Sequence, residues 1–194
     1  MKGQLTILTP QNVVAECLET AFGLKAYTGI INEVAKTGFK ATPEFRKVYN
    51  AYFRVRQRAL EWYDEFYAQM EAQKITRRSF GELLRIMQPV NGKLEVSFIS
   101  KLIATIDPEQ PIWDQYVIKN LGFYRQWENA RTKPVEYRLN LANDIYDAIC
   151  SWYDEFIDSK EGRECIHEFD VALPDYQSRL TAAKKVDYLL WSKR

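Results

Sequence analysis

A lysine and an aspartate near the middle of the chain are the residues whose types and spacing could do chemistry. Lys101 lies within the apolar run 97–106, and Asp114 stands where the next helix should begin. Two prolines lie between them, so the first helix must end near Ile106 and the chain must turn before Asp114. Lys101 is then roughly 7 to 8 Å from the end of its helix, at about 1.5 Å per residue, which its side chain can span. We therefore expect the two side chains to share one cleft.

The chemistry open to such a pair depends on its protonation. A lysine is a nucleophile only when it is neutral, and from a reference pKa of about 10.4 this requires desolvation or a neighbouring cation. Asp114 should stay ionised as a helix N-cap, because backbone N–H groups and the helix dipole stabilise its negative charge, and it could stabilise a cationic transition state. The apolar wall that would desolvate the amine is formed by Ile99, Leu102 and Ile103.

The same residues also have a purely structural interpretation. Aspartate is one of the commonest N-cap residues before an apolar helical run, so Asp114 could serve only to begin its helix. Lys101 could then carry its ammonium group to water or form a plain salt bridge with Asp114. Both interpretations stay open at the level of the sequence.

The order of a lysine followed by a helix-capping aspartate resembles the helix-hairpin-helix DNA glycosylase superfamily, in particular its 8-oxoguanine DNA glycosylase branch. The chain also looks like a group of bacterial proteins with that fold, whose tail often ends in an Asp-x-x-Leu-Trp pattern. The resemblance is specific over about Ser97 to Leu121. The residues that carry it are Ser100-Lys101, Pro111-Ile112-Trp113-Asp114 and the tail Asp187-Tyr188-Leu189-Leu190-Trp191.

The resemblance implies an all-α fold and a DNA glycosylase or AP lyase that repairs a damaged purine in DNA. In those enzymes the lysine attacks C1′ of the damaged nucleoside and forms a Schiff base, while the aspartate stabilises the sugar cation and assists the leaving base. Carried over, Lys101 takes the first role and Asp114 the second. The alternative is a helical module without chemistry that binds nucleic acid or a protein partner, in a defence or regulatory context.

The chain departs from the family at the hairpin before the lysine. A Gly-rich turn usually lets the backbone approach a phosphate there, because close approach needs glycine. Here the stretch from Gly92 to Ser100 holds one glycine, and Glu95 would oppose a phosphate. The four-cysteine cluster of some branches is absent as well.

The charge distribution along the chain indicates DNA as a possible partner. Residues 40–101 carry twelve basic against seven acidic groups, whereas residues 102–194 carry twelve against sixteen. A phosphate backbone requires a concentrated positive face, so the middle third could bind DNA. The alternatives are an ordinary solvated face, or a protein partner or second copy bound through aromatic surface. The expected nucleic-acid contacts are Arg54, Arg56, Arg58, Arg77, Arg78, Lys93 and Trp113, with Trp113, Tyr116 or Phe98 stacking on a flipped base.

Apolar spacing predicts a single all-α domain over residues 1–194 with seven to nine helices. The two longest should begin near Pro43 and Pro134, the first continuing as far as Met70. Glycines at 23 and 29 should interrupt the first helical segment, and a last helix should run over residues 178–191. The one strand-like pattern is the brief run 5–8.

Several classes of site are not expected. His167 is the only histidine and has no second ligand pair near it, so no metal site and no cofactor are predicted. The three cysteines, which are widely spaced, should be reduced core residues. No long apolar run or secretory segment occurs, so we expect no membrane partner and a cytoplasmic location.

Overall fold

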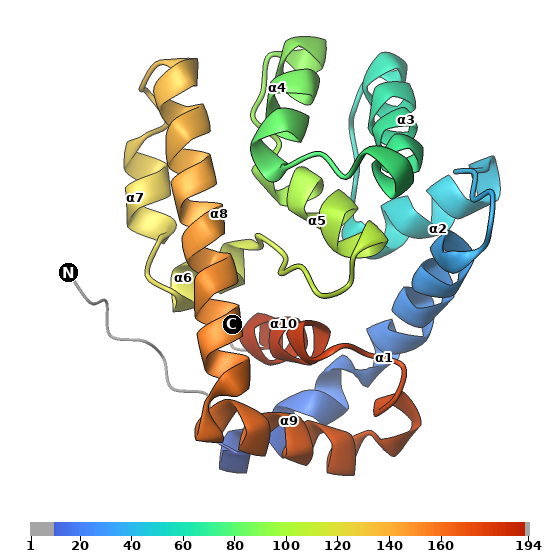
Figure 1. Cartoon of the computed structure of the whole chain (residues 1–194), viewed down its shortest axis with the longest axis vertical. Helices are drawn as coiled ribbons and strands as arrows, with labels where there is room; N and C mark the ends of the chain where they lie inside the picture. Colours follow the sequence, from blue (N-terminus) through green and yellow to red (C-terminus); the bar gives the residue numbers. More distant parts are fainter. Residues whose placement is uncertain (1–9, 193–194) are drawn as a thin grey trace.

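The computed structural model describes the backbone of residues 10–192 and the side chains of residues 23–191. Over these residues the chain is helical with no strand, which confirms the all-α prediction (Figure 1). Ten α-helices occur in this part of the chain, more than the seven to nine expected. They are α1 (Pro10–Ala35), α2 (Pro43–Phe53), α3 (Leu60–Thr76), α4 (Phe80–Asn91), α5 (Val96–Ile106), α6 (Gln115–Asn120), α7 (Tyr124–Asn129), α8 (Val135–Asp158), α9 (Lys160–Ala172) and α10 (Ala182–Ser192), with a 3₁₀ turn at Pro174–Tyr176.

Helix α1 is continuous, so the expected interruptions at Gly23 and Gly29 are wrong. A glycine inside a helix costs only about 1 kcal/mol relative to alanine. That cost is outweighed here because the helix packs against α2, α5, α9 and α10. Within the part of α1 whose side chains are described, the buried apolar residues are Leu24, Tyr27, Ile30 and Val34.

The predicted long helix from Pro43 is divided into α2 and α3. Its start is correct, because the Thr42 hydroxyl accepts a hydrogen bond from the Phe45 N–H at 3.3 Å. The helix ends at Arg54, which adopts the left-handed conformation with φ 55°. Val55 then turns into the core, and its N–H donates to the Asn50 carbonyl. No glycine or proline marks this break, so the sequence carried no stop signal for it.

The C-terminal half contains two helices that were not expected, α7 and α9. Helix α8 begins directly after Pro134, as predicted, but the chain then turns sharply at Ser159 into α9. The turn requires glycine at position 162, because a Cβ there would lie 1.8 Å from the Phe156 carbonyl oxygen. A 3₁₀ turn follows α9, and α10 begins at Ala182 rather than at residue 178.

Helix α10 lies at the centre of the molecule, where it packs against α1, α6, α8 and α9 (Figure 1). Nearly every residue of its first nine is buried, including two lysines and an aspartate. Charged side chains in such a position must find partners within the protein. Lys184 pairs with Asp187 at 3.1 Å, and Lys185 pairs with Asp170 of α9 at 2.6 Å.

Some predictions fall partly outside the described residues. The run 5–8 and the Cys17 side chain lie outside them, whereas Cys165 is buried and Cys150 is half-buried. Among the helices described, none has the length and apolar character needed to cross a bilayer.

Candidate functional site

Lys101 is positioned by α5, which follows a tight helix–turn–helix connection. Helix α4 begins with a capping box, in which Ser79 and Glu82 satisfy each other's backbone N–H groups. It continues through Pro89 to Asn91 and ends at Gly92, which has φ 70°. Helix α5 then buries most of its side chains, and the Lys101 side chain retains 13% exposure.

Asp114 is the N-cap of α6, as predicted. One carboxylate oxygen, Oδ1, accepts a hydrogen bond from the Tyr116 N–H at 2.9 Å. The other, Oδ2, lies 4.0 Å from the Nζ atom of Lys101, and the Asp114 side chain is 20% exposed. The structure therefore brings the two predicted residues together as a loose ion pair that solvent reaches only in part.

The surroundings of Lys101 disfavour its charged form. Burial lowers the pKa of its ammonium group, and the positive charges of Lys184 and Arg54 act in the same direction. The carboxylates of Asp114 and Asp187 oppose this lowering without cancelling it. The ammonium group also lies 5.5 Å from the centre of the Phe98 ring. A lysine in this setting loses its proton more readily than a lysine in water.

A buried charged cluster lies close to this pair, on α10 and α8. Lys184 donates to Asp187 Oδ2 at 3.1 Å, and both side chains are less than 10% exposed. The Tyr153 hydroxyl donates to Asp187 Oδ1 at 2.7 Å. Burial raises the pKa of the Asp187 carboxyl despite these partners. In the sequence, Asp187 stands out only within the tail pattern 187–191. The signal that could have marked it is the presence of charged residues within the apolar repeat of a helix.

The segment 54–59 between α2 and α3, here called the arginine loop, carries three of the predicted nucleic-acid contacts. Arg54 and Arg56 are exposed, and Arg54 is near enough to Lys101 to affect its pKa. Arg58 instead lies over the α4–α5 turn, with its Nε atom 2.8 Å from Glu95 Oε1 and its guanidinium donating to Oε2 at 3.1 Å. Glu95, which was expected to oppose a phosphate, therefore has its charge neutralised within the protein.

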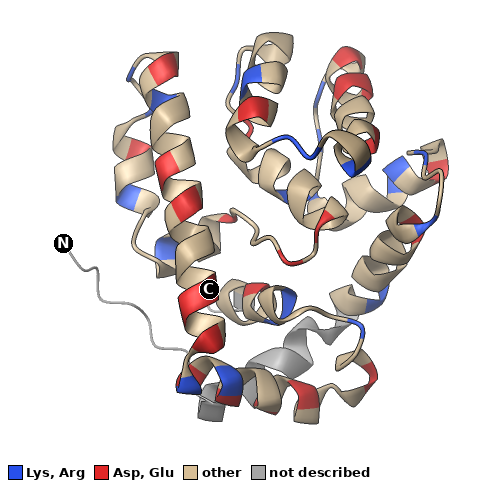
Figure 2. Ribbon diagram, viewed as in Figure 1, with Lys and Arg blue, Asp and Glu red and all other residues tan. Residues whose placement is uncertain are grey.

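The remaining predicted basic contacts lie in connections between helices, and Lys and Arg positions are spread over many elements of the molecule (Figure 2). Arg77 and Arg78 lie in the connection between α3 and α4. Arg77 is exposed with φ 46°, whereas the Arg78 guanidinium donates to Gln69 Oε1 at 2.9 Å. Lys93 is exposed in the α4–α5 turn, where its backbone N–H donates to Asn91 Oδ1. These three residues therefore lie in two different connections, α3–α4 and α4–α5.

The expected stacking role of Trp113 is not compatible with its position. The side chain is 2% exposed and lies in the core beside Phe80 and Trp127. It is buried because the extended segment before Asp114 points this side chain inward between α4 and α7. Phe98 is half-buried beneath Arg58 and Lys101, and Tyr116 contacts Trp191 edge-on.

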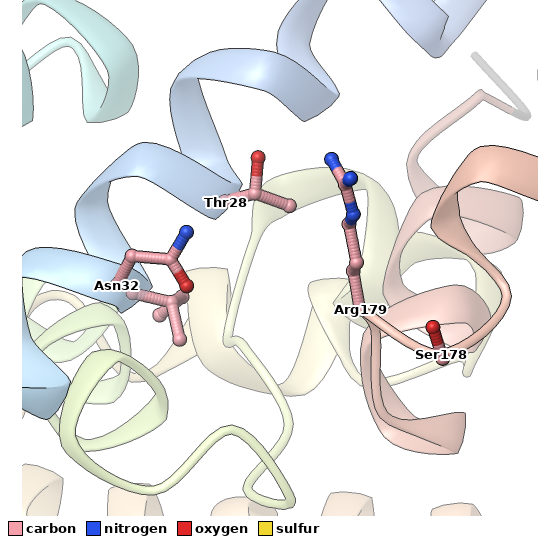
Figure 3. A pocket seen from close by; sticks show the side chains of 5 residues that line it. Thr28, Asn32, Ser178 and Arg179 are labelled. Atoms are coloured by element: carbon pink, nitrogen blue, oxygen red, sulfur yellow. The ribbon is translucent and has the colours of Figure 1, made fainter.

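Two hollows on the surface are lined by other residues. The larger, of about 470 Å³, lies between Thr28, Ile31 and Asn32 of α1 and the segment with Ser178 and Arg179 (Figure 3). The second, of about 280 Å³, lies over α6 and α7. Neither lining includes Lys101 or Asp114. Among the side chains of residues 23–191, no group of histidine, cysteine, aspartate and glutamate could hold a metal ion.

Comparisons of the chain with protein-family models, with curated proteins and with solved structures find no match. The resemblance to DNA glycosylases therefore stays a prediction.

Proposed function

We propose that Lys101 and Asp114 are the chemical site of a DNA glycosylase or AP lyase that acts on a damaged purine. The observation that carries the proposal is the approach of the two side chains, 4.0 Å apart and both only partly exposed, at the junction of α5 and α6. An amine and a carboxylate so placed match what a Schiff-base mechanism requires.

The electrostatics support this assignment. Burial of Lys101 lowers its pKa and so increases the neutral fraction, which is the nucleophilic form. The Tyr116 N–H holds Asp114 Oδ1, so that Oδ2 faces the amine at 4.0 Å. A sugar cation that forms between the two groups would be stabilised by the carboxylate charge.

The reaction balances with these two residues, the substrate and water. The neutral amine of Lys101 forms a bond to C1′ while the bond from C1′ to the base breaks, and the base leaves with the electron pair and takes a proton from the attacking nitrogen. The bond from C1′ to the ring oxygen then opens to give an iminium ion, and the ring oxygen takes a proton from water. Asp114 stabilises the positive charge that develops on the sugar in the first step.

Docking of the DNA is assigned to the exposed part of the arginine loop. Arg54 and Arg56 present their charges to solvent, and Arg54 lies near Lys101. Phosphate contacts of this kind position a strand without reading its sequence. Arg58 contributes indirectly, because its contact with Glu95 holds the loop against the α4–α5 turn.

Borohydride trapping tests the chemistry, using a panel of damaged duplexes. The wild-type protein should form a covalent adduct that Lys101→Ala abolishes, since the amine becomes part of the bond. Lys160→Ala, which removes a highly exposed lysine of α9, is the matched control and should trap normally. Asp114→Asn should slow base release at least about tenfold while DNA binding persists.

The second candidate function is a helical binding module without chemistry. It is favoured by the partial occlusion of Lys101 and Asp114 and by the burial of Trp113. If the wild-type protein traps and cleaves no lesion, and Lys101→Ala leaves DNA binding unchanged, this candidate replaces the glycosylase.

A further inference from the structure

The chain between α5 and α6, residues 107–114, is fixed by hydrogen bonds from three other elements. The Pro108 carbonyl accepts from the Thr181 hydroxyl at 2.6 Å, and the Pro111 carbonyl accepts from the Tyr146 hydroxyl at 3.1 Å. Two backbone N–H groups immediately before Asp114 are also bound, each by a buried side chain. Such a degree of fixation is unusual for a connection of this length, because loops generally satisfy their backbone groups with water.

The first of these side chains is Ser100, the residue before Lys101. Its Oγ atom accepts from the Trp113 N–H at 2.8 Å and donates to the Ser97 carbonyl at 3.0 Å. Ser100 is fully buried. The hydrogen bond from Trp113 to Ser100 therefore runs beside the ion pair of Asp114 and Lys101, joining the residues that directly precede each member.

The second side chain is Asp187 of α10. Its Oδ1 atom accepts from the Ile112 N–H at 3.2 Å as well as from the Tyr153 hydroxyl, while Oδ2 accepts from Lys184. A buried carboxylate with this many donors is held in one orientation. It can therefore serve as a fixed anchor for the segment that leads to Asp114.

We propose that Ser100 and Asp187 are positioning residues, which hold the backbone at Ile112 and Trp113 so that Asp114 faces Lys101. Removal of either acceptor leaves a buried N–H group unpaired, and the segment must move to satisfy it. The inference rests on the proposed function for the purpose of this arrangement. The arrangement itself can be tested without DNA.

The test measures how Lys101 titrates, by competitive labelling with acetic anhydride over a range of pH and mass spectrometry of the labelled peptides. Only the neutral amine reacts, so the profile reports the Lys101 pKa. Asp114→Asn should lower it, because a facing negative charge is lost. Ser100→Ala should lower it in the same direction, and the double variant should match Asp114→Asn alone, since Ser100 acts through Asp114.

Thr105→Ala is the matched control for the serine. Thr105 is buried on the same helix, and its hydroxyl donates to the Lys101 carbonyl within α5 rather than to the segment 107–114. It should leave the Lys101 titration unchanged. If Ser100→Ala does not fold, Ser100→Cys keeps a weaker acceptor at the same place and should give a smaller shift in the same direction.

Asp187 is tested by comparing two substitutions. Both Asp187→Asn and Asp187→Ala remove the charge, but asparagine keeps a carbonyl oxygen that can accept from Ile112. The Lys101 pKa should therefore be lower in the alanine variant than in the asparagine variant, and this difference should vanish when Asp114→Asn is also present. If Asp187→Ala does not fold, the comparison of Ser100→Ala, Asp114→Asn and their double variant decides the proposal.

Two results would overturn the proposal. One is a Lys101 titration that Ser100→Ala leaves at its wild-type position, and the other is a shift of equal size with and without Asp114→Asn. If no adduct is trapped, but the Ser100→Ala shift disappears in the presence of Asp114→Asn, the glycosylase is rejected and the positioning role is kept. If an adduct is trapped, but the Ser100→Ala shift is the same with and without Asp114→Asn, the glycosylase is kept and the positioning role is rejected.

Discussion

The contact between Arg58 and Glu95 offers a sharp test of how the arginine loop is held. The Arg58 side chain is 21% exposed and the Glu95 side chain 10%. Besides Arg58, Glu95 accepts from the Asn91 side-chain amide at 3.0 Å, and the guanidinium lies over the rings of Trp62 and Phe98. The substitution Glu95→Gln removes the charge while nearly conserving the shape.

The loss of stability expected for Glu95→Gln lies between two known limits. Exposed ion pairs contribute about 0.2 to 1 kcal/mol, and loss of one partner of a fully buried pair costs about 3 to 5 kcal/mol. The burial of Glu95 places the pair nearer the second limit, but glutamine keeps one acceptor and Arg58 keeps some contact with water. We therefore expect Glu95→Gln to lower the free energy of unfolding by about 2 kcal/mol.

Urea denaturation followed by circular dichroism measures this change as a shift of the midpoint urea concentration, provided that the dependence of the unfolding free energy on urea keeps the same slope. Glu136→Gln is the matched control, because Arg85 donates to both oxygens of Glu136 at 2.9 Å on the open surface. Solvent screens that pair, so no resolvable change is expected for the control. Equal midpoints for the two variants would refute the argument that burial of Glu95 makes Arg58 the anchor of the loop.

Two further predictions concern charge. Reversal of both Arg54 and Arg56 to glutamate should weaken DNA binding for all sequences alike and reduce the slope of log K against log salt by about 2. Reversal of Arg125 and Arg131, the control, should leave that slope unchanged. An unchanged slope after reversal of Arg54 and Arg56 would exclude the arginine loop from phosphate binding. Burial raises the pKa of seven tyrosines. Their contribution to the free energy of unfolding is complete below about pH 10, where the tyrosines of the unfolded chain are still protonated. Above that pH, each of these tyrosines lowers the free energy of unfolding by about 1.4 kcal/mol per pH unit. Lys101, with its lowered pKa, contributes in the opposite direction but as a single group. Absorbance from the seven buried phenolates should therefore appear only together with loss of helical dichroism near pH 11, and phenolate absorbance from more than five of the twelve tyrosines in a folded chain would contradict the burial of these rings.

The features of the fold that the sequence determined are those with local causes. A threonine before Pro43, a serine at position 79 and an aspartate at position 114 each offer a side-chain oxygen to the first turn of a helix, and all three caps form. The prolines after Ile106 likewise end α5 where expected, because proline cannot continue the helical hydrogen bonds. The approach of Lys101 to Asp114 followed from these two signals together.

Other features depended on contacts between residues distant in the chain. Helix α1 continues through Gly29 because its buried face is covered on several sides, and the arginine loop forms without glycine or proline because Val55 enters the core. Trp113 looked available for stacking, yet it lies inside because the segment before Asp114 is tied to Ser100 and Asp187.

The sequence alone therefore determined that the chain is helical, where several helices begin, and that one lysine and one aspartate would meet. Tertiary structure alone decided which charges are paired inside the protein, as with Arg58 and Glu95 or Lys184 and Asp187. The reason is physical: a cap or a helix end is set by hydrogen bonds within a few residues, whereas burial and ion pairing depend on which distant surfaces pack together.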